Sequence, residues 1–600
     1  MSIESKRKLK SFLKHFIESL KLCWQASPVM FSTRIFFEIF TIVSPILLAH
    51  QLKTIVNLLL NTSVTKKDML KAFTLLILSI IFIRLLTVVL ENIKRIFTDN
   101  HNELINHNID KQILTKINDL DISYFDSPEY HNEISNVYND SRALQDLAFM
   151  VITMIRSFFQ IFSCFYILFR VNALVPIIVI LLIVPAVFID NYVLKKRYDW
   201  ERESTLERRK INYIKSILNG QPYAKDIRIF HTDQYFFEKY ENQWKNWFGL
   251  KKKVYKKGTM FSAIAQLIPH LAVYSILFFI GIKIINNDLT VGDFTFYNGV
   301  IVQFVGGVTS LFASVNKAYE SEQKLLNFSN FLDLPCNIDA SGTYKIDKIQ
   351  SIEFKGVSFK YPNTQNFVLN HVSFKLEAGK ITALVGENGA GKTTIIKLIL
   401  RLYDPTDGTI LINDINIKDV EVKSLHKAIG VVFQDFNTYE LTLREAVAIS
   451  DIDNLNNDEA IVSACDNADF HINCNRFANG LCTYIGKTFD SEGVILSGGQ
   501  KQKLAISSAY FKNCSYYIMD EPNSALDPVA DNDLISKLVQ LSKNHGSFFI
   551  SHKLSVMHIT DEILVLENGR IVESGSHNVL MSKNGVYKNL YLAQAEKYKH

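Results

Sequence analysis

Residues 381–400 read ITALVGENGAGKTTIIKLIL, and this stretch decides the fold of the C-terminal half of the chain. It starts as an apolar run typical of a buried strand, passes through closely spaced glycines, and ends with the pattern of a helix. Gly386 to Thr393 match G-x-x-x-x-G-K-T at every position, which is the pattern of a phosphate-binding loop. Because this loop lies between a strand and a helix, the sequence predicts an α/β nucleotide-binding domain.

The loop residues have separate predicted roles toward ATP. Backbone N–H groups of the loop are expected to bind the β-phosphate, Lys392 to reach the β- and γ-phosphates, and Thr393 to ligate Mg²⁺. The predicted ATP-binding residues of the loop are Gly386, Glu387, Asn388, Gly389, Ala390, Gly391, Lys392, Thr393 and Thr394.

Two further apolar strands are predicted downstream, and each delivers candidate catalytic side chains. YYIMDEP ends in adjacent carboxylates, of which Asp520 is predicted to hold Mg²⁺ and Glu521 to act as the general base toward water. FFISHKLS places His552 where it would contact the γ-phosphate as charge develops there. A histidine at the end of a strand is commonly structural, so the role of His552 depends on the neighbouring motifs.

Residues 496–507, LSGGQKQKLAIS, predict a second anion site. Two glycines and a serine hydroxyl stand at the start of a predicted helix, where unpaired N–H groups and the helix dipole favour negative charge. Since the chain already carries a phosphate loop, this second site needs its own explanation.

The N-terminal half has the composition of a membrane domain. By count, residues before Ser351 carry a net charge of about +10 and the remainder about −5, and a basic half this apolar favours a membrane surface over nucleic acid. Six runs are long enough to cross a bilayer. They are Val29–His50, Phe73–Leu90, Leu144–Phe169, Leu174–Leu194, Met260–Ile285 and Phe294–Val315. Seven scattered cysteines without a CxxC pair indicate neither a disulfide framework nor a zinc site.

Charge asymmetry between the connections predicts the orientation of this half. Two long connections, about 91–142 and 195–257, are dense in Lys and Arg, which places them and both termini in the cytoplasm. Residues 1–28 have helical apolar spacing without a signal-peptide core, so a helix lying in the inner interface is favoured over a plain cytoplasmic helix. The expected organisation is 1–28 interfacial helix, 29–317 transmembrane domain, 318–350 linker and 351–600 nucleotide-binding domain.

Few charges fall inside the predicted spans. Arg34 and Glu38 are one turn apart and could pair with each other. Arg84, Arg156 and His270 lack such a local partner; a polar cavity, snorkelling and pairing between helices all remain open for them.

Together these motifs resemble the ABC transporters, and the whole chain resembles a bacterial ABC exporter half-transporter with six spans ahead of the ATPase domain. The resemblance implies that Tyr361 in VSFKYP stacks on adenine and that Gln434 in VVFQDF contacts Mg²⁺ and the attacking water. It also implies that SALD, ending at Asp527, links two ATP sites. The signature residues Ser497, Gly498, Gly499 and Gln500 would bind ATP held by the opposite subunit, which answers why a second anion site exists.

A homodimer is therefore the simplest expected assembly, with a heterodimer containing a degenerate partner left open. Three features depart from the family pattern: lysine at Lys503 and at Lys553, where arginine is common, and an expanded segment, YIGKTFDSEGVI, before the signature. Glu492 is the candidate for the coupling role of that segment. Tyr124–Ile134 and Asn219–Tyr240 are expected to contain short helices that rest on an ATPase domain.

The cargo is the least determined property. YFDSPEY, AKDIRIF and the expanded segment look most like exporters of lantibiotics and other ribosomally made peptides, so a peptide is the expected substrate. Multidrug and lipid exporters share all the strong motifs and remain alternatives, as does, more remotely, an ATP-gated channel or regulator. With Cys23 as the only thiol ahead of or near the first span, the chain is not expected to cleave its cargo.

Overall fold

The computed structural model describes residues 3–597 except 62–64, 127, 337, 339, 363, 474–475, 522–536, 538–544 and 552–553. Its contacts divide the chain into two units. The first unit comprises Met1–Asn118 and Asn132–Leu334, and the second comprises Asp119–His131 and Pro335–His600. A short piece of the predicted transmembrane domain, Asp119–His131, therefore clusters with the nucleotide-binding half.

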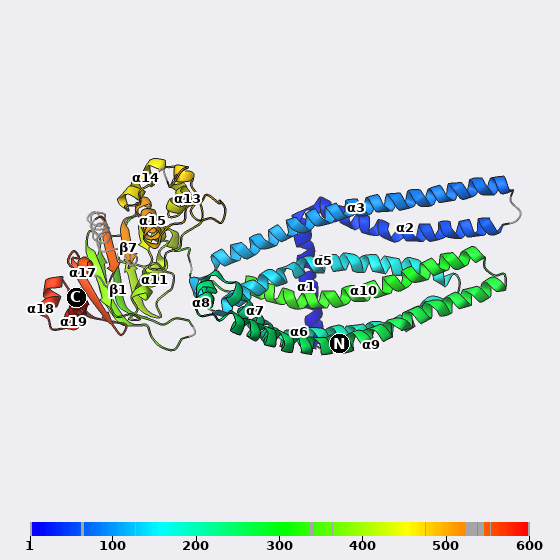
Figure 1. The fold of residues 1–600 in the computed structure, drawn as a ribbon, viewed down its shortest axis with the longest axis horizontal. Helices are drawn as coiled ribbons and strands as arrows, with labels where there is room; N and C mark the ends of the chain where they lie inside the picture. The colour runs from blue at the N-terminus through cyan, green and yellow to red at the C-terminus, as the bar shows by residue number, and fades with distance from the viewer. Residues whose placement is uncertain are drawn as a thin grey trace. The chain divides into compact units, whose positions relative to one another are not determined.

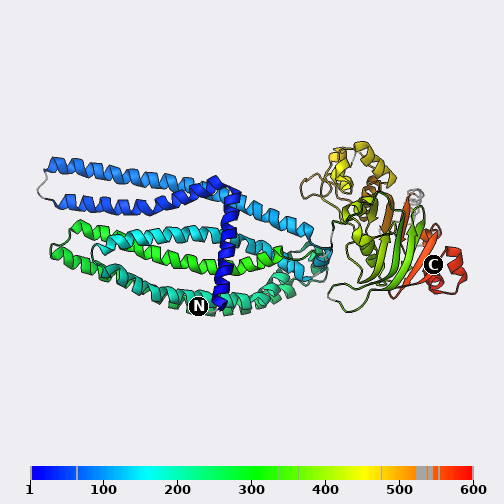
Figure 2. The ribbon, with the colours of Figure 1, turned by 180° about the vertical axis from the view of Figure 1, so that it is seen from behind.

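The first unit is helical (Figure 1). Six of its described helices are long and apolar enough to span a membrane, as the sequence predicts. The helices of the unit are α1 (Ile3–Ala26), α2 (Pro28–Leu60), α3 (Lys66–Asp119), α5 (Pro128–Phe169), α6 (Leu174–Glu203), α7 (Thr205–Asn219), α8 (Ala224–Ile229), α9 (Asp233–Ile285) and α10 (Val291–Leu332). Helix α1 runs across the long helices in both views, an orientation that suits a helix lying in the membrane interface (Figures 1 and 2).

The long basic connections are largely helical and continue the spanning helices, with short breaks between them. Helix α3 has 54 residues and α9 has 53. A 54-residue helix extends about 80 Å, far more than the roughly 30 Å of hydrocarbon in a bilayer. The charged segments continue the helices beyond the span because Lys, Arg and Glu are good helix formers. Short helices do occur in both expected regions, at α4 (Ile122–Phe125) and α8.

The local ion pair that Arg34 and Glu38 could form is not the one adopted by the described residues. The Glu38 carboxylate contacts Lys94 Nζ at 2.5 Å and Arg156 at 3.4 Å, on two other helices. Arg34 instead donates to the Asn102 side-chain oxygen at 3.2 Å and lies over the Phe149 ring. Interhelical pairing is therefore the outcome for Arg156, because a buried carboxylate between helices is satisfied best by cations from more than one of them.

The second unit contains two sheets. The first has the order β2-β1-β4-β5, and the second has the order β10-β9-β3-β8-β7-β6. The strands are β1 (Ser351–Phe359), β2 (Leu369–Glu377), β3 (Ile381–Gly386), β4 (Asp407–Ile412), β5 (Ile415–Asn416), β6 (Ile429–Val432), β7 (Tyr516–Asp520), β8 (Gly546–Ile550), β9 (Glu562–Glu567) and β10 (Arg570–Gly575). The helices are α4, α11 (Lys392–Ile399), α12 (Val422–Ala428), α13 (Leu443–Ala448), α14 (Asp458–Asn467), α15 (Gly498–Phe511), α17 (Leu554–Met557), α18 (His577–Ser582) and α19 (Val586–Lys597).

The six-stranded sheet places the candidate motifs at one edge. Strands β3, β8, β7 and β6 are mutually parallel neighbours. The phosphate loop follows β3, Asp520 ends β7, and Gln434 comes two residues after β6. Ligands of open parallel sheets bind outside the carboxyl ends of the strands, so this edge is the candidate site.

Candidate nucleotide-binding site

The phosphate loop is held in shape by its glycines and by Lys392. Strand β3 is buried along its whole length, and α11 starts directly after Gly391, which has a φ of +107°. A side chain at Gly391 would also meet Leu369 at 2.8 Å, so both backbone conformation and space require glycine there. The Lys392 ammonium donates to the Gly386 and Glu387 carbonyls at 2.8 and 3.0 Å, and so lies across the loop.

Thr393 and Asp520 form the candidate magnesium site. The Thr393 hydroxyl donates to the Asp520 carboxylate at 3.2 Å, although the two residues are 127 positions apart in sequence. Asp520 is only 2% exposed, and burial raises its pKa to about 6, with the neighbouring Glu521 charge adding to the effect. Oxygen donors of this kind suit Mg²⁺, whose charge would stabilise the buried carboxylate. The residues present therefore fit the ion that the sequence predicts.

Glu521 and Gln434 meet across the edge of the sheet. The Gln434 side-chain amide donates to the Glu521 carboxylate at 3.0 Å. Glu521 has a φ of +47°, an unusual conformation for a residue with a side chain, and its N–H donates to the Ile550 carbonyl at 2.9 Å. Strained backbone of this kind persists where the surroundings fix it, and it is common at active sites. The structure thus brings together the predicted base and the predicted water-contacting glutamine.

Tyr361 lies in an aromatic group beside the phosphate loop. Its hydroxyl is 3.1 Å from that of Thr394, and its ring meets Phe359 and Tyr403 edge-to-face at centroid distances of 5.1 and 5.4 Å. A cavity of about 420 Å³ lies beside Tyr361 and Tyr403. This position is compatible with stacking on a nucleobase, which remains a prediction.

The sequence analysis missed Tyr403, which contacts Asp126 in the segment Tyr124–Ile134 that was expected to rest on an ATPase domain. The Tyr403 hydroxyl donates to the Asp126 carboxylate at 2.6 Å, and Lys397 contacts the same carboxylate at 3.0 Å. Burial alone would raise the pKa of Asp126, but these two donors outweigh it and hold the pKa below its usual range. No local pattern signals this contact, since Asp126 and Tyr403 are 277 positions apart.

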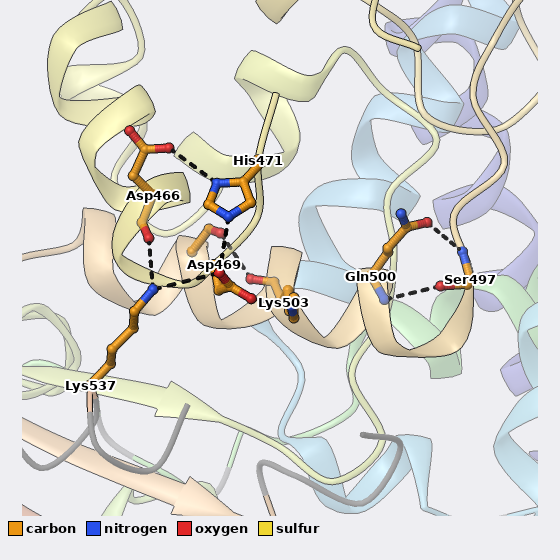
Figure 3. A network of polar contacts seen from close by, with 8 residues as sticks. Asp466, Asp469, His471, Ser497, Gln500, Lys503 and Lys537 are labelled. Carbon is orange, nitrogen blue, oxygen red and sulfur yellow. Dashed lines mark hydrogen bonds and ion pairs between the residues drawn. The ribbon is translucent and has the colours of Figure 1, made fainter. Parts of the chain in front are cut away.

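The signature residues form the capped start of a helix, as the sequence predicts. Ser497 is the N-cap of α15, its side chain accepts from the Gln500 N–H, and the Gln500 side chain accepts from the Ser497 N–H (Figure 3). Arg476, which the sequence analysis did not single out, donates to the Gln500 side-chain oxygen at 2.8 Å and to the Ile495 carbonyl at 2.7 Å. Gly498 and Gly499 open the helix behind this fixed cap.

Lys503, one of the departures from the family pattern, points away from the cap. Figure 3 shows its ammonium in contact with Asp469, which also contacts His471 at 3.0 Å and Lys537 at 3.8 Å. The lysine therefore joins α15 to the segment after α14 and leaves Ser497 and its glycines unaltered. The hydrogen bond from Lys503 holds the pKa of Asp469 below its usual range.

We expect Asp469→Asn to lower the melting temperature at pH 7 by about 2–4 °C, since the mostly buried Lys503 ammonium loses its partner. A carboxylate with a depressed folded-state pKa stabilises above its unfolded pKa of about 4, and this contribution is lost as pH falls through the folded value. The difference between variant and parent should thus shrink below about pH 4. Asp466→Asn is the control, because Asp466 is more exposed and, among the described residues, its carboxylate contacts His471 alone, at 3.9 Å. Thermal unfolding across pH checks this, and a difference that stays constant with pH would contradict it.

Asp527 and His552 lie outside the described residues, so their predicted roles remain predictions. Strand β8 ends at Ile550, two residues before His552.

Two family models cover most of the chain. One, described as the ABC transporter transmembrane region, matches residues 31–308, and the other, described as ABC transporter, matches residues 369–524. The chain belongs to the ABC transporters. The order of the two matches is that of an exporter half-transporter, with the membrane domain fused ahead of the ATPase domain.

Similar ABC transporters match between about half and nearly all of the chain. The subtilin transport ATP-binding protein SpaT of Bacillus subtilis is 29% identical over 600 residues, covering 98% of this chain and 96% of SpaT. The nisin transport ATP-binding protein NisT of Lactococcus lactis is 28% identical over 85% of this chain and 86% of NisT. An ATP-dependent lipid A-core flippase of Haemophilus influenzae is 35% identical, over 55% of this chain and 56% of the flippase.

The fold also matches a solved structure. A bacterial Atm1-family ABC exporter with ATP bound superimposes with a TM-score of 0.79 at 21% identity, covering 95% of this chain and 98% of that one. At this identity the likeness shows the exporter fold alone. Six helical spans followed by an α/β ATPase domain are therefore established, and this ABC exporter hydrolyses ATP coupled to transport.

Proposed function

We propose that this ABC exporter is a homodimer that moves a peptide out across the cytoplasmic membrane. The observation that supports a peptide substrate is the match to SpaT, which extends over nearly all of both chains and includes the membrane domain. Membrane-domain similarity bears on cargo, whereas the ATPase motifs are common to all exporters. With the basic ends of the long helices in the cytoplasm, both termini lie there too.

The site geometry suits hydrolysis by an activated water. Glu521 is placed to accept a proton from water, and Gln434, which donates to Glu521, is placed to orient that water. Lys392 and the loop N–H groups bind the phosphates, with His552 added from the end of β8. Mg²⁺, held by Thr393 and Asp520, would neutralise charge on the phosphate oxygens.

The signature helix supports the dimer. In the part of the second unit that the structure describes, Ser497 is fixed by its own capping box, and Ser497 and Gly498 are exposed at the start of this helix. Two chains arranged head to tail would each complete the other's ATP site. ATP binding would then favour the closed pair and an outward-open membrane domain, and hydrolysis would release it.

Asp126 is the proposed contact for transmitting this change. It precedes α5, which continues into a membrane span, and it contacts Lys397 and Tyr403 beside Tyr361. We expect Asp126→Ala to keep basal ATP hydrolysis within about twofold and to remove most substrate-stimulated hydrolysis, since exposed pairs contribute little to stability. ATPase assays in liposomes with and without substrate check this. Asp119→Ala, which removes an exposed carboxylate in the same segment, is the control, and equal stimulation in parent and Asp126→Ala would contradict the proposed contact.

The cargo proposal is tested by the ATPase rate of the purified protein in liposomes, titrated separately with peptides, hydrophobic drugs and lipids. Saturable stimulation or inhibition by peptides alone is expected. The flippase match, although it spans little more than half of each chain, makes a lipid the alternative substrate. A response to lipids or drugs and not to peptides would favour a lipid or multidrug exporter and would leave the ATPase assignment intact.

A further inference from the structure

A cavity of about 970 Å³ lies within the helices of the first unit. Helices α2, α3, α5 and α10 all contribute to its wall. The lining residues are Thr41, Ser44, Pro45, Leu48, Ala49, Leu52, Arg84, Thr87, Glu91, Lys94, Arg95, Thr98, Arg156, Phe294, Thr295, Asn298, Gly299 and Gln303. Four of these side chains are cationic and one is anionic, which is an unusual wall for a cavity among apolar helices.

Helix α3 supplies most of the charge from a single face. Its lining residues are Arg84, Thr87, Glu91, Lys94, Arg95 and Thr98. These positions recur at three- and four-residue intervals, so they form one stripe along the helix. The stripe starts at Arg84, inside the span predicted from sequence, and continues toward the predicted cytoplasmic end. Charged and hydroxyl groups of α3 therefore line the cavity from Arg84 to Thr98.

Among the described residues, only two of the four cationic side chains of this cavity have an ionic partner. Lys94 and Arg156 share the carboxylate of Glu38. Among the residues that the structure describes, Arg95 donates to the Asn92 side-chain oxygen alone, at 3.3 Å. Arg84 has no hydrogen bond or ion pair with any residue that the structure describes. A guanidinium at membrane depth is costly unless an anion or water satisfies it, so Arg84 is the centre of the candidate site.

A second cavity, of about 840 Å³, adjoins the first, because Phe294 and Asn298 line both. Its other lining residues are His270, Val273, Tyr274, Leu277, Phe278, Gly281, Ile282, Ile285, Val302 and Val305, nearly all apolar or aromatic. The two cavities together offer a cationic surface beside an apolar one. A substrate that combines acidic groups with apolar ones would be complementary to the two linings.

We propose that the first cavity binds an acidic segment of the transported peptide, with Arg84 and Arg95 as the residues that select its carboxylates. This inference rests on the proposed peptide function and narrows it. Guanidinium groups bind carboxylates through paired, charge-assisted hydrogen bonds, which are strongest where water is scarce. The same cationic wall repels a peptide that carries only cationic groups. The transporter would therefore select its cargo by the net charge of the segment that binds in this cavity.

The test uses the full-length protein in phosphatidylcholine liposomes and three fluorescent peptides of equal length and apolar content, carrying glutamate, glutamine or lysine. We expect the glutamate peptide to bind about tenfold more tightly than the glutamine peptide, and the lysine peptide to bind most weakly. Arg84→Gln should remove most of the preference, and Arg84→Glu should reverse its sign. Lys71→Gln, on α3 but outside the lining, should keep the preference of the parent.

Three outcomes are informative, and the parent protein alone distinguishes them if the Arg84 variants fail to fold. Tighter binding of the glutamate peptide, weakened by salt, supports the inference. Equal binding of all three peptides overturns it and leaves peptide export in place. Stimulation by added phosphatidylglycerol with no binding of any peptide overturns both, because the cationic wall would then serve a lipid headgroup.

Discussion

Glu521→Gln is expected to reduce ATP hydrolysis by about 10²–10⁴-fold while leaving ATP binding close to that of the parent. The variant keeps the size and hydrogen-bonding capacity of the side chain but removes the carboxylate that accepts the proton of water. Because Glu521 lies 3.0 Å from the Gln434 amide and outside the loop of residues 386–393, the substitution leaves the sequence of the phosphate loop unchanged. ATP should then hold the two chains together without release, so that a stable ATP-bound dimer accumulates.

The measurement pairs ATPase rate with size-exclusion chromatography in the presence of ATP and Mg²⁺. Glu353→Gln, on β1 and paired with Lys355 at 3.3 Å, is the control for a carboxylate lost elsewhere in the same domain. It should keep nearly the full rate. Hydrolysis by Glu521→Gln at close to the parent rate would show that another group is the base.

The sequence predicts the local parts of this protein well, and the reason is physical. Three features depend mainly on residues that are neighbours in sequence: the phosphate loop, the two strands that lead into this loop and into Asp520, and the capped helix start at Ser497. Their backbone conformations are set by glycines, by the pattern of apolar residues and by short-range hydrogen bonds. The six spans are equally local, since a bilayer requires a long apolar run in a single segment. All of these features are confirmed as structure.

The contacts that join distant segments were not predictable in this way. Glu38 has a local candidate partner in Arg34, yet it pairs with Lys94 and Arg156, because helix packing decides which cations reach it. Asp126 and Tyr403 give no sign of each other in sequence. The sequence contains some signal that the basic connections are helical, since their residues favour helix. The apolar periodicity that usually identifies a helix is weak, however, where the helix leaves the membrane for water.

The arrangement of the two ATP sites is tested most sharply by combining variants in dimers of defined composition. Lys392→Ala should abolish the function of a phosphate loop, and Ser497→Arg should abolish that of a signature, since it removes the cap of α15 and places a bulky cation at the helix start. If each site joins the loop of one chain to the signature of the other, a dimer with one variant on each chain has one intact site. A dimer of parent and double variant then has none.

We therefore expect ATP occlusion and residual hydrolysis in the dimer that carries Lys392→Ala on one chain and Ser497→Arg on the other. The dimer of parent and double variant should occlude no ATP, although it contains the same substitutions in the same number. Because the two dimers carry the same substitutions in the same number, any effect of these substitutions on folding is the same in both. Each dimer is therefore the control for the other. The opposite result, with function only in the parent and double-variant dimer, would mean that each chain completes its own site. The second anion site at Ser497 would then serve the ATP of its own subunit, and the head-to-tail dimer would lose its structural basis.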